Sequence, residues 1–329
     1  ASLVLKDSDE KFRKALIKRY QNYSRGRPFY RGRALQQLML PLEAENREHQ
    51  DLYIEGYNFL GPMIGAFVHH LADECRRLGL TKLFFFSREG YTFKKVWDIC
   101  TPVLFPDGNL PETEYLYVSR MALAGASCAM EGLTATSANI ALLPPGNKNF
   151  RDIARIFQLD LNALEPHLER HKLTADSVLS QLHEGYNQKF TVRLMELLED
   201  SHFQDQIKDQ TRDSNKALIR YLTEVGFFVH DQVAVADIGW LGTIQRFLYN
   251  AVKHRPDCPR LHGYVFGATR GIPFQGDLKN SLTGVIYDRH HFDLGASSIL
   301  YARDLFEEAC RAPHPTIERY QLSADGYEL

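Results

Sequence analysis

Two kinds of segment alternate along much of the chain, short apolar runs and longer stretches with helical periodicity. Apolar residues recur at spacings of three and four from Leu52 to Leu78, which predicts an amphipathic helix. Apolar runs that end in polar turns predict strands at 81–86, 115–118, 232–236, 261–266 and 281–287. Helical patterns follow the first, second and third of these runs, at 91–99, from 120 onward and at 244–252. Strands that alternate with helices predict an α/β fold, a parallel sheet flanked by helices on both faces.

The middle of the chain has a different pattern. Helical periodicities occur at 150–157, 178–182, 190–198 and 217–225, without a strand pattern among them. We therefore expect a helical insertion at 147–225, on the ligand side of the sheet. The α/β core would comprise 57–146 and 226–329, and a basic helical extension would occupy 1–56.

Composition and charge narrow the class of protein. The 329 residues are 44% hydrophobic and 24% charged, which is typical of a folded globular chain and not of a disordered one. Five cysteines are scattered without zinc-ligand spacing, which favours free thiols in a reducing compartment. No apolar run is long enough to span a membrane, so we expect a cytoplasmic protein.

The N-terminal region carries a local excess of positive charge. Between Asp7 and Arg33, Lys and Arg outnumber the acidic residues and are interleaved with aromatic side chains. The open interpretations are a solvated helix face, a nucleic-acid contact and peripheral contact with an anionic membrane surface. The formal net charge of −2 provides no overall field to hold nucleic acid, so we expect no nucleic-acid partner. Peripheral contact at the inner face of the plasma membrane stays open.

Polar loops follow three of the predicted strands, where a parallel sheet binds its ligands. The first holds Ser87, Arg88, Glu89, Gly90 and Tyr91, the second Ser119 and Arg120, and the third Asp237, Gly239, Trp240, Leu241, Gly242, Thr243 and Gln245. Arginine offers a fork of donors to an anion, and a helix N-terminus presents free N–H groups to a phosphate. Structural alternatives remain, because Arg88 could simply pair with Glu89 and the glycines could simply form turns.

The segment at 233–243, which joins the end of the third of these strands to its loop, resembles the signature of type I phosphoribosyltransferases. The segments FFSREGY at 85–91, YLYVSR at 115–120 and DIGWLGTIQ at 237–245 resemble, more specifically, a module of bacterial polysaccharide-assembly proteins. That phosphoribosyltransferase-like glycosyltransferase module often lies beside a haloacid-dehalogenase-type phosphatase. The resemblance extends from about 57 to 320. It implies transfer of ribofuranose 5-phosphate from phosphoribosyl pyrophosphate to a sugar hydroxyl of an O antigen or capsule, with inversion to a β-ribofuranoside.

The resemblance also implies roles for the loop residues. Arg88 and Mg²⁺ would neutralise the departing diphosphate, Gly90 would let the backbone approach it, and Ser119 with Arg120 would form a second anion contact. The phosphatase, as a domain or a partner protein, would later remove the 5-phosphate from the product.

The third loop would hold the ribose and its 5-phosphate. By the resemblance, Asp237 grips the ribose hydroxyls and is the residue expected to bind Mg²⁺. The backbone from Leu241 to Gln245, with Thr243, would cradle the 5-phosphate. Trp240 would wall the ribose pocket or stack on an acceptor sugar. The family's acidic pair is reduced to one acid here, because Ala236 stands at its first position.

A sugar hydroxyl is a poor nucleophile and would benefit from a general base. The candidates are Asp213, Asp231, His290, His291, Glu307 and Glu308. We favour Glu307 and Glu308, because both carboxylates lie at a predicted helix end near the mouth of the sheet. Two other functions remain open. A nucleobase phosphoribosyltransferase would need a hood over a flat base, and the loss of an acid at Ala236 would suit a phosphosugar-binding module without turnover.

Overall fold

The centre of the protein is a parallel β-sheet. The structure, a computed structural model, describes residues 28, 32, 56–143, 146–181, 185–186, 188–269, 278–324 and 326–329, so nearly all of the expected N-terminal extension lies outside the described residues. Five parallel strands pair in the order β2–β1–β6–β7–β8. Their bounds are β1 Lys82–Phe86, β2 Glu112–Leu116, β6 Gln232–Trp240, β7 Arg260–Ala268 and β8 Asn280–Asp288. The α/β fold expected from the sequence is confirmed.

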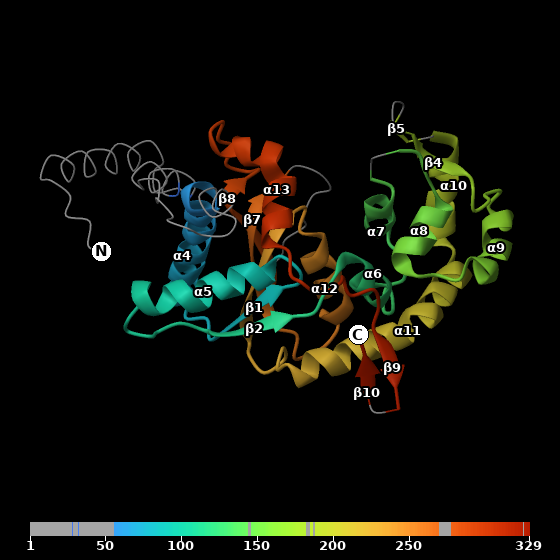
Figure 1. Cartoon of the computed structure of the whole chain (residues 1–329). Helices are drawn as coiled ribbons and strands as arrows, with labels where there is room; N and C mark the ends of the chain where they lie inside the picture. Colours follow the sequence, from blue (N-terminus) through green and yellow to red (C-terminus); the bar gives the residue numbers. More distant parts are fainter. Residues whose placement is uncertain are drawn as a thin grey trace, which may run out of the picture.

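Helices cover both faces of this sheet (Figure 1). One face carries α4 (Gly61–Leu78), which follows the π-helical turn η1 (Gly56–Leu60), together with α5 (Gly90–Leu104), the 3₁₀ helix η2 (Ala296–Ala302) and α13 (Arg303–Cys310). The other face carries α6 (Arg120–Ser127), α11 (Ser201–Glu224) and α12 (Thr243–Val252). None of the described helices has the length and the apolar character that crossing a bilayer requires.

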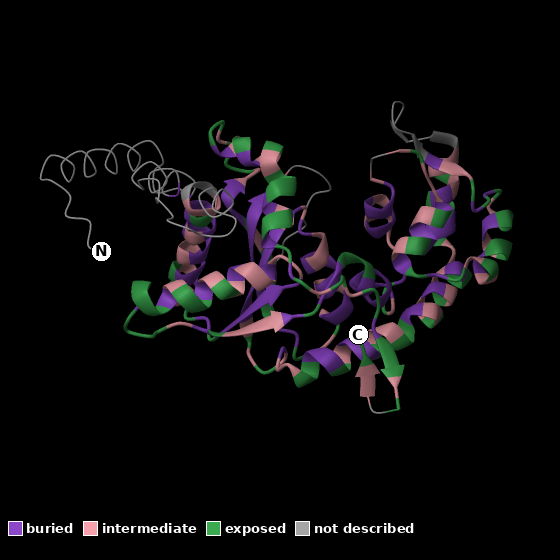
Figure 2. Ribbon diagram, in the orientation of Figure 1, coloured by how far each residue is buried: buried purple, intermediate pink, exposed green. Residues whose placement is uncertain are grey.

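The residues of β1 show why this sheet is buried on both sides. All five are buried, and successive side chains point to opposite faces. Phe84 packs on Phe227 beneath one face, with ring centroids 5.2 Å apart, and Phe85 packs on Trp97 of α5 at 5.9 Å. Figure 2 shows the sheet as the buried centre of this part of the molecule. The apolar run at 81–86 therefore forms a central strand.

The region at 147–225 contains more than helices. It includes α8 (Phe150–Phe157), α9 (Leu161–Arg170), α10 (Gln188–Glu199) and α11, preceded in the chain by α7 (Ala135–Ala141). A small antiparallel sheet joins β3 (Lys148–Asn149), β4 (Val178–Gln181) and β5 (Gly185–Tyr186). The helical interpretation of 178–182 is wrong, because so short a run has no decisive period and its two pairing partners fix it as a strand. In Figure 1 these elements lie at one end of α11, away from the central sheet.

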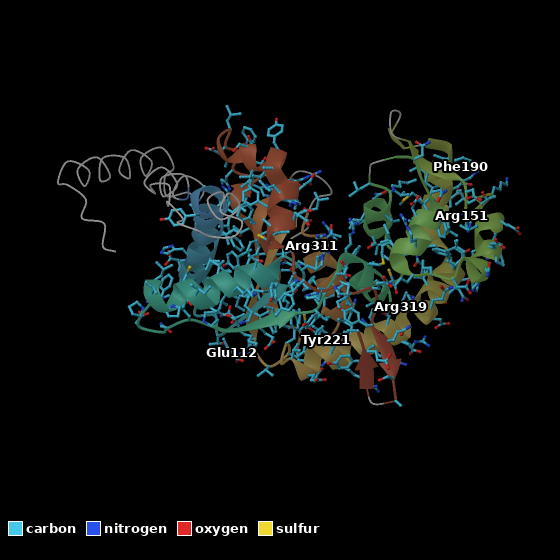
Figure 3. The ribbon with its side chains drawn as sticks, in the orientation of Figure 1. Glu112, Arg151, Phe190, Tyr221, Arg311 and Arg319 are labelled. Carbon is cyan, nitrogen blue, oxygen red and sulfur yellow. The ribbon has the colours of Figure 1, made fainter. Side chains whose placement is uncertain are left out.

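The C-terminal segment returns across the sheet after α13 (Figure 1). It ends in the hairpin of β9 (Gln321–Ser323) and β10 (Gly326–Glu328), which packs on α11. Tyr320 donates a hydrogen bond to the carbonyl of Tyr117 at 2.8 Å, and the Tyr117 N–H donates to the hydroxyl of Tyr221 on α11 at 2.7 Å. Figure 3 labels Tyr221 in this contact region. These bonds fix the segment that follows β2.

The end of β6 differs from the sequence prediction. A loop was expected from Asp237 to Thr243, but the strand continues to Trp240, which still pairs with Ala268 of β7. Gly239 has φ of 131°, and a Cβ there would lie 2.2 Å from the carbonyl oxygen of Gly267. The two glycines allow a close approach that a pattern of apolar residues does not reveal.

The order of the strands reverses between β1 and β6. From β1 the chain moves outward to β2 on one side, whereas β6, β7 and β8 build the sheet outward on the other side. Such a reversal separates the connections that leave the two central strands, and it opens a crevice outside their carboxyl ends. The topology therefore predicts a ligand site between the segments that follow β1 and β6.

Gly90 provides a test of the packing beneath this crevice. A Cβ at Gly90 would lie 2.9 Å from the backbone carbon of Phe85. A side chain there would therefore force α5 away from β1 and shift the main chain. We expect Gly90→Ala to lower the free energy of unfolding by about 1–3 kcal/mol. Equilibrium unfolding in urea measures this change.

Gly65, in the interior of α4, is the matched control. Among the described residues, no heavy atom beyond its chain neighbours and the backbone of its own helix would lie within 4 Å of a Cβ there. Since Ala is a better helix former than Gly by up to about 1 kcal/mol, Gly65→Ala should stabilise the protein. Equal effects of the two substitutions would contradict the close packing at Gly90.

Candidate active site

A cavity of about 500 Å³ opens at the predicted crevice, a size typical of small-molecule sites. It brings together residues from all three loops that the sequence analysis selected: Ser87, Arg88, Glu89, Ser119, Arg120, Gly239, Trp240, Leu241 and Thr243. Glu307, also selected, completes the wall with Val118, Ile244, Thr269, Arg303 and Thr316. None of these lining residues comes from 147–225, so no described residue of the inserted region walls the cavity.

Two of the predicted ligand residues hold the loops in place. The Ser87 hydroxyl donates to the carbonyl of Val118 at 2.5 Å and accepts from its N–H at 3.0 Å, which joins the ends of β1 and β2. The Ser119 hydroxyl accepts from the N–H of Ala122 as the N-cap of α6 and donates to the carbonyl of Ile317 at 2.6 Å. The Ser87–Arg88 and Gly239–Trp240 peptide bonds, both beside the cavity, are cis.

Three arginines give the cavity its capacity for an anion. The Arg88 guanidinium lies 3.9 Å from the nearest Glu89 carboxylate oxygen, which is too far for a hydrogen bond. Arg120 is exposed and forms no salt bridge with any described residue. Arg303 lies 3.5 Å from the carboxylate of Asp304. Since none is held by a short ion pair, all three can turn toward a phosphate or diphosphate.

The N-terminus of α12 adds backbone donors. The helix begins at Thr243, which lines the cavity, and its N-cap Gly242 adopts a left-handed conformation with φ of 68°. No side chain caps this helix, so the N–H groups of its first turn are not used by a capping residue. Free N–H groups and the positive end of the helix dipole favour a bound phosphate.

A tryptophan holds one carboxylate at the cavity wall. The indole Nε1 of Trp240 donates to Glu307 at 2.6 Å. The ring lies so close to β7 that a Cβ at Gly267 would be 2.3 Å from it. Glu308, the other favoured general base, pairs with Arg311 instead and does not line the cavity. Figure 3 labels Arg311 at the end of α13. Of the two acids, the structure therefore brings only Glu307 to the site.

Asp237 lies at the site in a different manner from the one expected. It is buried and is not a lining residue, and its Oδ1 accepts from the N–H of Ile238 at 2.7 Å. Burial, together with the negative charges of Glu89 and Glu307, raises the pKa of Asp237 to about 8. At neutral pH this group therefore carries a proton, and the carboxylates that face the cavity are Glu89 and Glu307.

Four other predicted ligand residues do not line the cavity, and contacts within the protein account for them. Gly90 packs on β1, Gly242 is the N-cap of α12, and Tyr91 contacts the ring of Tyr115 and the ammonium of Lys95. Gln245 is buried and donates to Asn280 Oδ1 at 2.7 Å and to the carbonyl of Ser281 at 2.8 Å. Gln245 therefore joins α12 to β8.

The remaining general-base candidates also lie elsewhere. Asp213 belongs to α11, and Asp231 precedes the amino end of β6, opposite the cavity. His291 is exposed beside Asp288, and His290 accepts a hydrogen bond from Arg289. None of these four side chains lines the cavity.

The sequence analysis did not select five of the lining residues: Val118 and Ile244 lie within the segments that it compared, and Thr269, Arg303 and Thr316 lie outside them. Arg303 lies one helical turn before Glu307, so the i, i+4 rule would have placed it on the same face of a helix. Thr269 directly follows β7, and the argument used for the other three strands would have selected it. Thr316 has no comparable signal, because it belongs to an irregular segment.

Comparisons with the families of known proteins and with curated proteins found no match. Among the described residues, no group of three or more His, Cys, Asp and Glu side chains is arranged to hold a metal ion by itself.

The raised pKa of Asp237 has a measurable consequence for stability. Between about pH 4 and 8 the folded protein keeps a proton that the unfolded chain, with an Asp pKa of about 3.9, has lost. The free energy of unfolding should therefore fall as pH rises, by up to about 1.4 kcal/mol per unit from this group alone. Asp237→Asn removes this contribution. Urea unfolding of both proteins from pH 5 to 8 should show the variant gaining stability relative to wild type, and a constant difference would contradict the assignment.

Proposed function

We propose that this protein is a phosphoribosyl pyrophosphate-dependent glycosyltransferase, which transfers ribofuranose 5-phosphate to a sugar hydroxyl of a bacterial surface polysaccharide such as an O antigen or capsule. The observation that carries the proposal is a single cavity with three arginines, an uncapped helix N-terminus and a fixed carboxylate. This donor has a diphosphate on C1 and a phosphate on C5, so it needs two anion sites on either side of a ribose. The resemblance of the three loop segments supports the same donor.

The two anion sites have distinct candidates. Arg88 and Arg120, from the loops after β1 and β2, would bind the diphosphate through charge-assisted hydrogen bonds. The first turn of α12, with the hydroxyl of Thr243, would bind the 5-phosphate. The ribose between them would lie near Trp240, in keeping with one of the two roles expected for this residue.

The residues of this cavity fit a magnesium ion. Mg²⁺ is usually held by one or two carboxylates together with substrate phosphates and water, and Glu89 supplies such a carboxylate. Bound with the diphosphate, it would offset the charge of the leaving group. Asp237, the residue first expected to hold the metal, would join these oxygens only after losing its proton.

The chain's own residues account for the remaining steps. Arg88 would stabilise the diphosphate as the bond to C1 breaks. Glu307, oriented by Trp240, would accept the proton of the acceptor hydroxyl as that oxygen attacks C1. Attack opposite the leaving diphosphate inverts an α donor and gives a β-ribofuranoside.

The proposal includes a place for the protein in the cell. The module would act in the cytoplasm, with the basic N-terminal region available for contact with the inner face of the plasma membrane. A haloacid-dehalogenase-type phosphatase, as a domain or partner, would remove the 5-phosphate from the product. A nucleobase phosphoribosyltransferase and a phosphosugar-binding module without turnover are the competing functions.

Donor binding is the first test. We expect phosphoribosyl pyrophosphate with Mg²⁺ to raise the melting temperature, because a ligand at a hundredfold excess over Kd stabilises the folded state by about 2.7 kcal/mol. Nucleotide sugars should leave the melting curve unchanged. Mass spectrometry of mixtures with donor and glycans should then detect a glycan heavier by one ribose 5-phosphate. Stabilisation by a nucleotide sugar alone would overturn the choice of donor, transfer to a free nucleobase would favour the salvage reaction, and binding without any product would favour the binding module.

Glu307 and Glu308 form a matched pair for testing the general base. Glu307→Gln should lower kcat by about 10²–10⁴-fold, because the amide cannot accept the proton of the hydroxyl. Stabilisation by the donor should persist. Glu308→Gln, on the adjacent residue outside the cavity, should change kcat by less than about threefold, or about 0.7 kcal/mol. Similar kcat values for the two variants would exclude Glu307 as the base.

A further inference from the structure

A second cavity adjoins the candidate active site. Its volume is about 560 Å³, and its lining residues are Thr269, Tyr287, Phe292, Leu300 and Arg303. Thr269 and Arg303 also line the first cavity, so the two spaces share a boundary. The first cavity is lined mainly by charged and polar groups, whereas the second has two aromatic rings and an aliphatic side chain. A ligand that extends from one into the other would meet both kinds of surface.

Helix α13 relates the shared boundary to the proposed chemistry. Arg303 and Glu307 are four residues apart on this helix and therefore lie on one face. Arg303 borders both cavities, and Glu307 borders only the first. An acceptor whose hydroxyl reaches Glu307 could thus keep the rest of its ring beyond Arg303, in the second cavity.

The aromatic residues of the second cavity suit a sugar better than a flat base. Phe292 is 56% exposed, whereas Tyr287 is only 5% exposed, so Phe292 offers the open ring surface. Their ring planes are perpendicular, with centroids 6.4 Å apart. Perpendicular rings do not form the parallel slot that would stack a nucleobase on both faces. A pyranose can place its C–H face on one ring while its hydroxyls accept from Arg303, which combines the apolar and polar contacts usual in a ligand pocket.

We infer that the second cavity is the acceptor subsite, which binds a pyranose residue of the acceptor glycan against Phe292 and Arg303. This inference rests on the proposed function, because it names the acceptor of that reaction. It also explains why an aromatic cavity adjoins a charged one, since the donor and acceptor differ in charge.

The test uses methyl glycosides as probes. Saturation-transfer NMR would be recorded on the whole protein with the methyl α- and β-pyranosides of glucose, galactose and mannose. We expect at least one of them to bind, and Phe292→Ala to weaken that binding by about fivefold or more. Tyr301→Ala is the matched control, because this tyrosine is 94% exposed on η2 and lines neither cavity. It should bind the same probe as wild type does.

The outcomes separate this inference from the proposed function. Three results would overturn the acceptor subsite. The first is that the wild type binds none of the probes, and the second is that Phe292→Ala binds them as tightly as the wild type does. The third result is that adenine or uracil binds in place of the glycosides and requires Phe292. Stabilisation by phosphoribosyl pyrophosphate should be the same in wild type and both variants, because neither Phe292 nor Tyr301 borders the first cavity. If phosphoribosyl pyrophosphate did not stabilise the wild type, that result would instead overturn the proposed donor, and the acceptor role with it.

Discussion

The close approach of β6 and β7 at their carboxyl ends is the constraint on which the site depends. Side chains at Gly239 or Gly267 would collide with the carbonyl of Gly267 or with the ring of Trp240, respectively. Because both residues are glycines, β6 stays paired to its last residue and Trp240 lies against β7. Its indole then holds Glu307, which fixes the face of α13 that meets the cavity. The two glycines thus determine the position of the Glu307 carboxylate.

Charges of both signs surround the same small space, and the protein balances them unequally. Arg88, Arg120 and Arg303 lie on the surface of the cavity, where water screens them and leaves them able to move toward a ligand. Asp237 is buried beside two carboxylates and avoids a third negative charge by keeping its proton. An anion that arrives with a divalent cation would satisfy both groups at once, because the arginines gain partners and the carboxylates lose their repulsion. This balance favours a phosphorylated ligand over a neutral one.

Sequence patterns predicted the fold well because burial on both faces leaves a strong signal. The apolar run of β1 could hardly lie anywhere but in the middle of a sheet, and the polar loops after three strands had to meet at one edge. The patterns failed where tertiary contacts decide. Val178–Gln181 is a strand because of its pairing partners, and β6 passes its expected end because of glycines in two strands. Loop membership also did not reveal that Gln245 faces β8 and not the cavity.

The choice between Glu307 and Glu308 shows what a sequence leaves undetermined about a site. Adjacent helical residues point about 100° apart, so a cavity beside a helix can contact one of them and not the other. Which one faces it depends on how α13 is rotated, and Trp240 and the packing of Phe306 on Phe266 settle that rotation.

The chain that follows α13 supplies Thr316 to the cavity and the carbonyl that binds Ser119. The walls of the site therefore come from segments nearly 200 residues apart in the chain, as the separation of 198 between Ser119 and Ile317 shows. Docking of the C-terminal segment on the sheet therefore completes one wall of the cavity, and the bond from the Ser119 hydroxyl to the carbonyl of Ile317 holds it there.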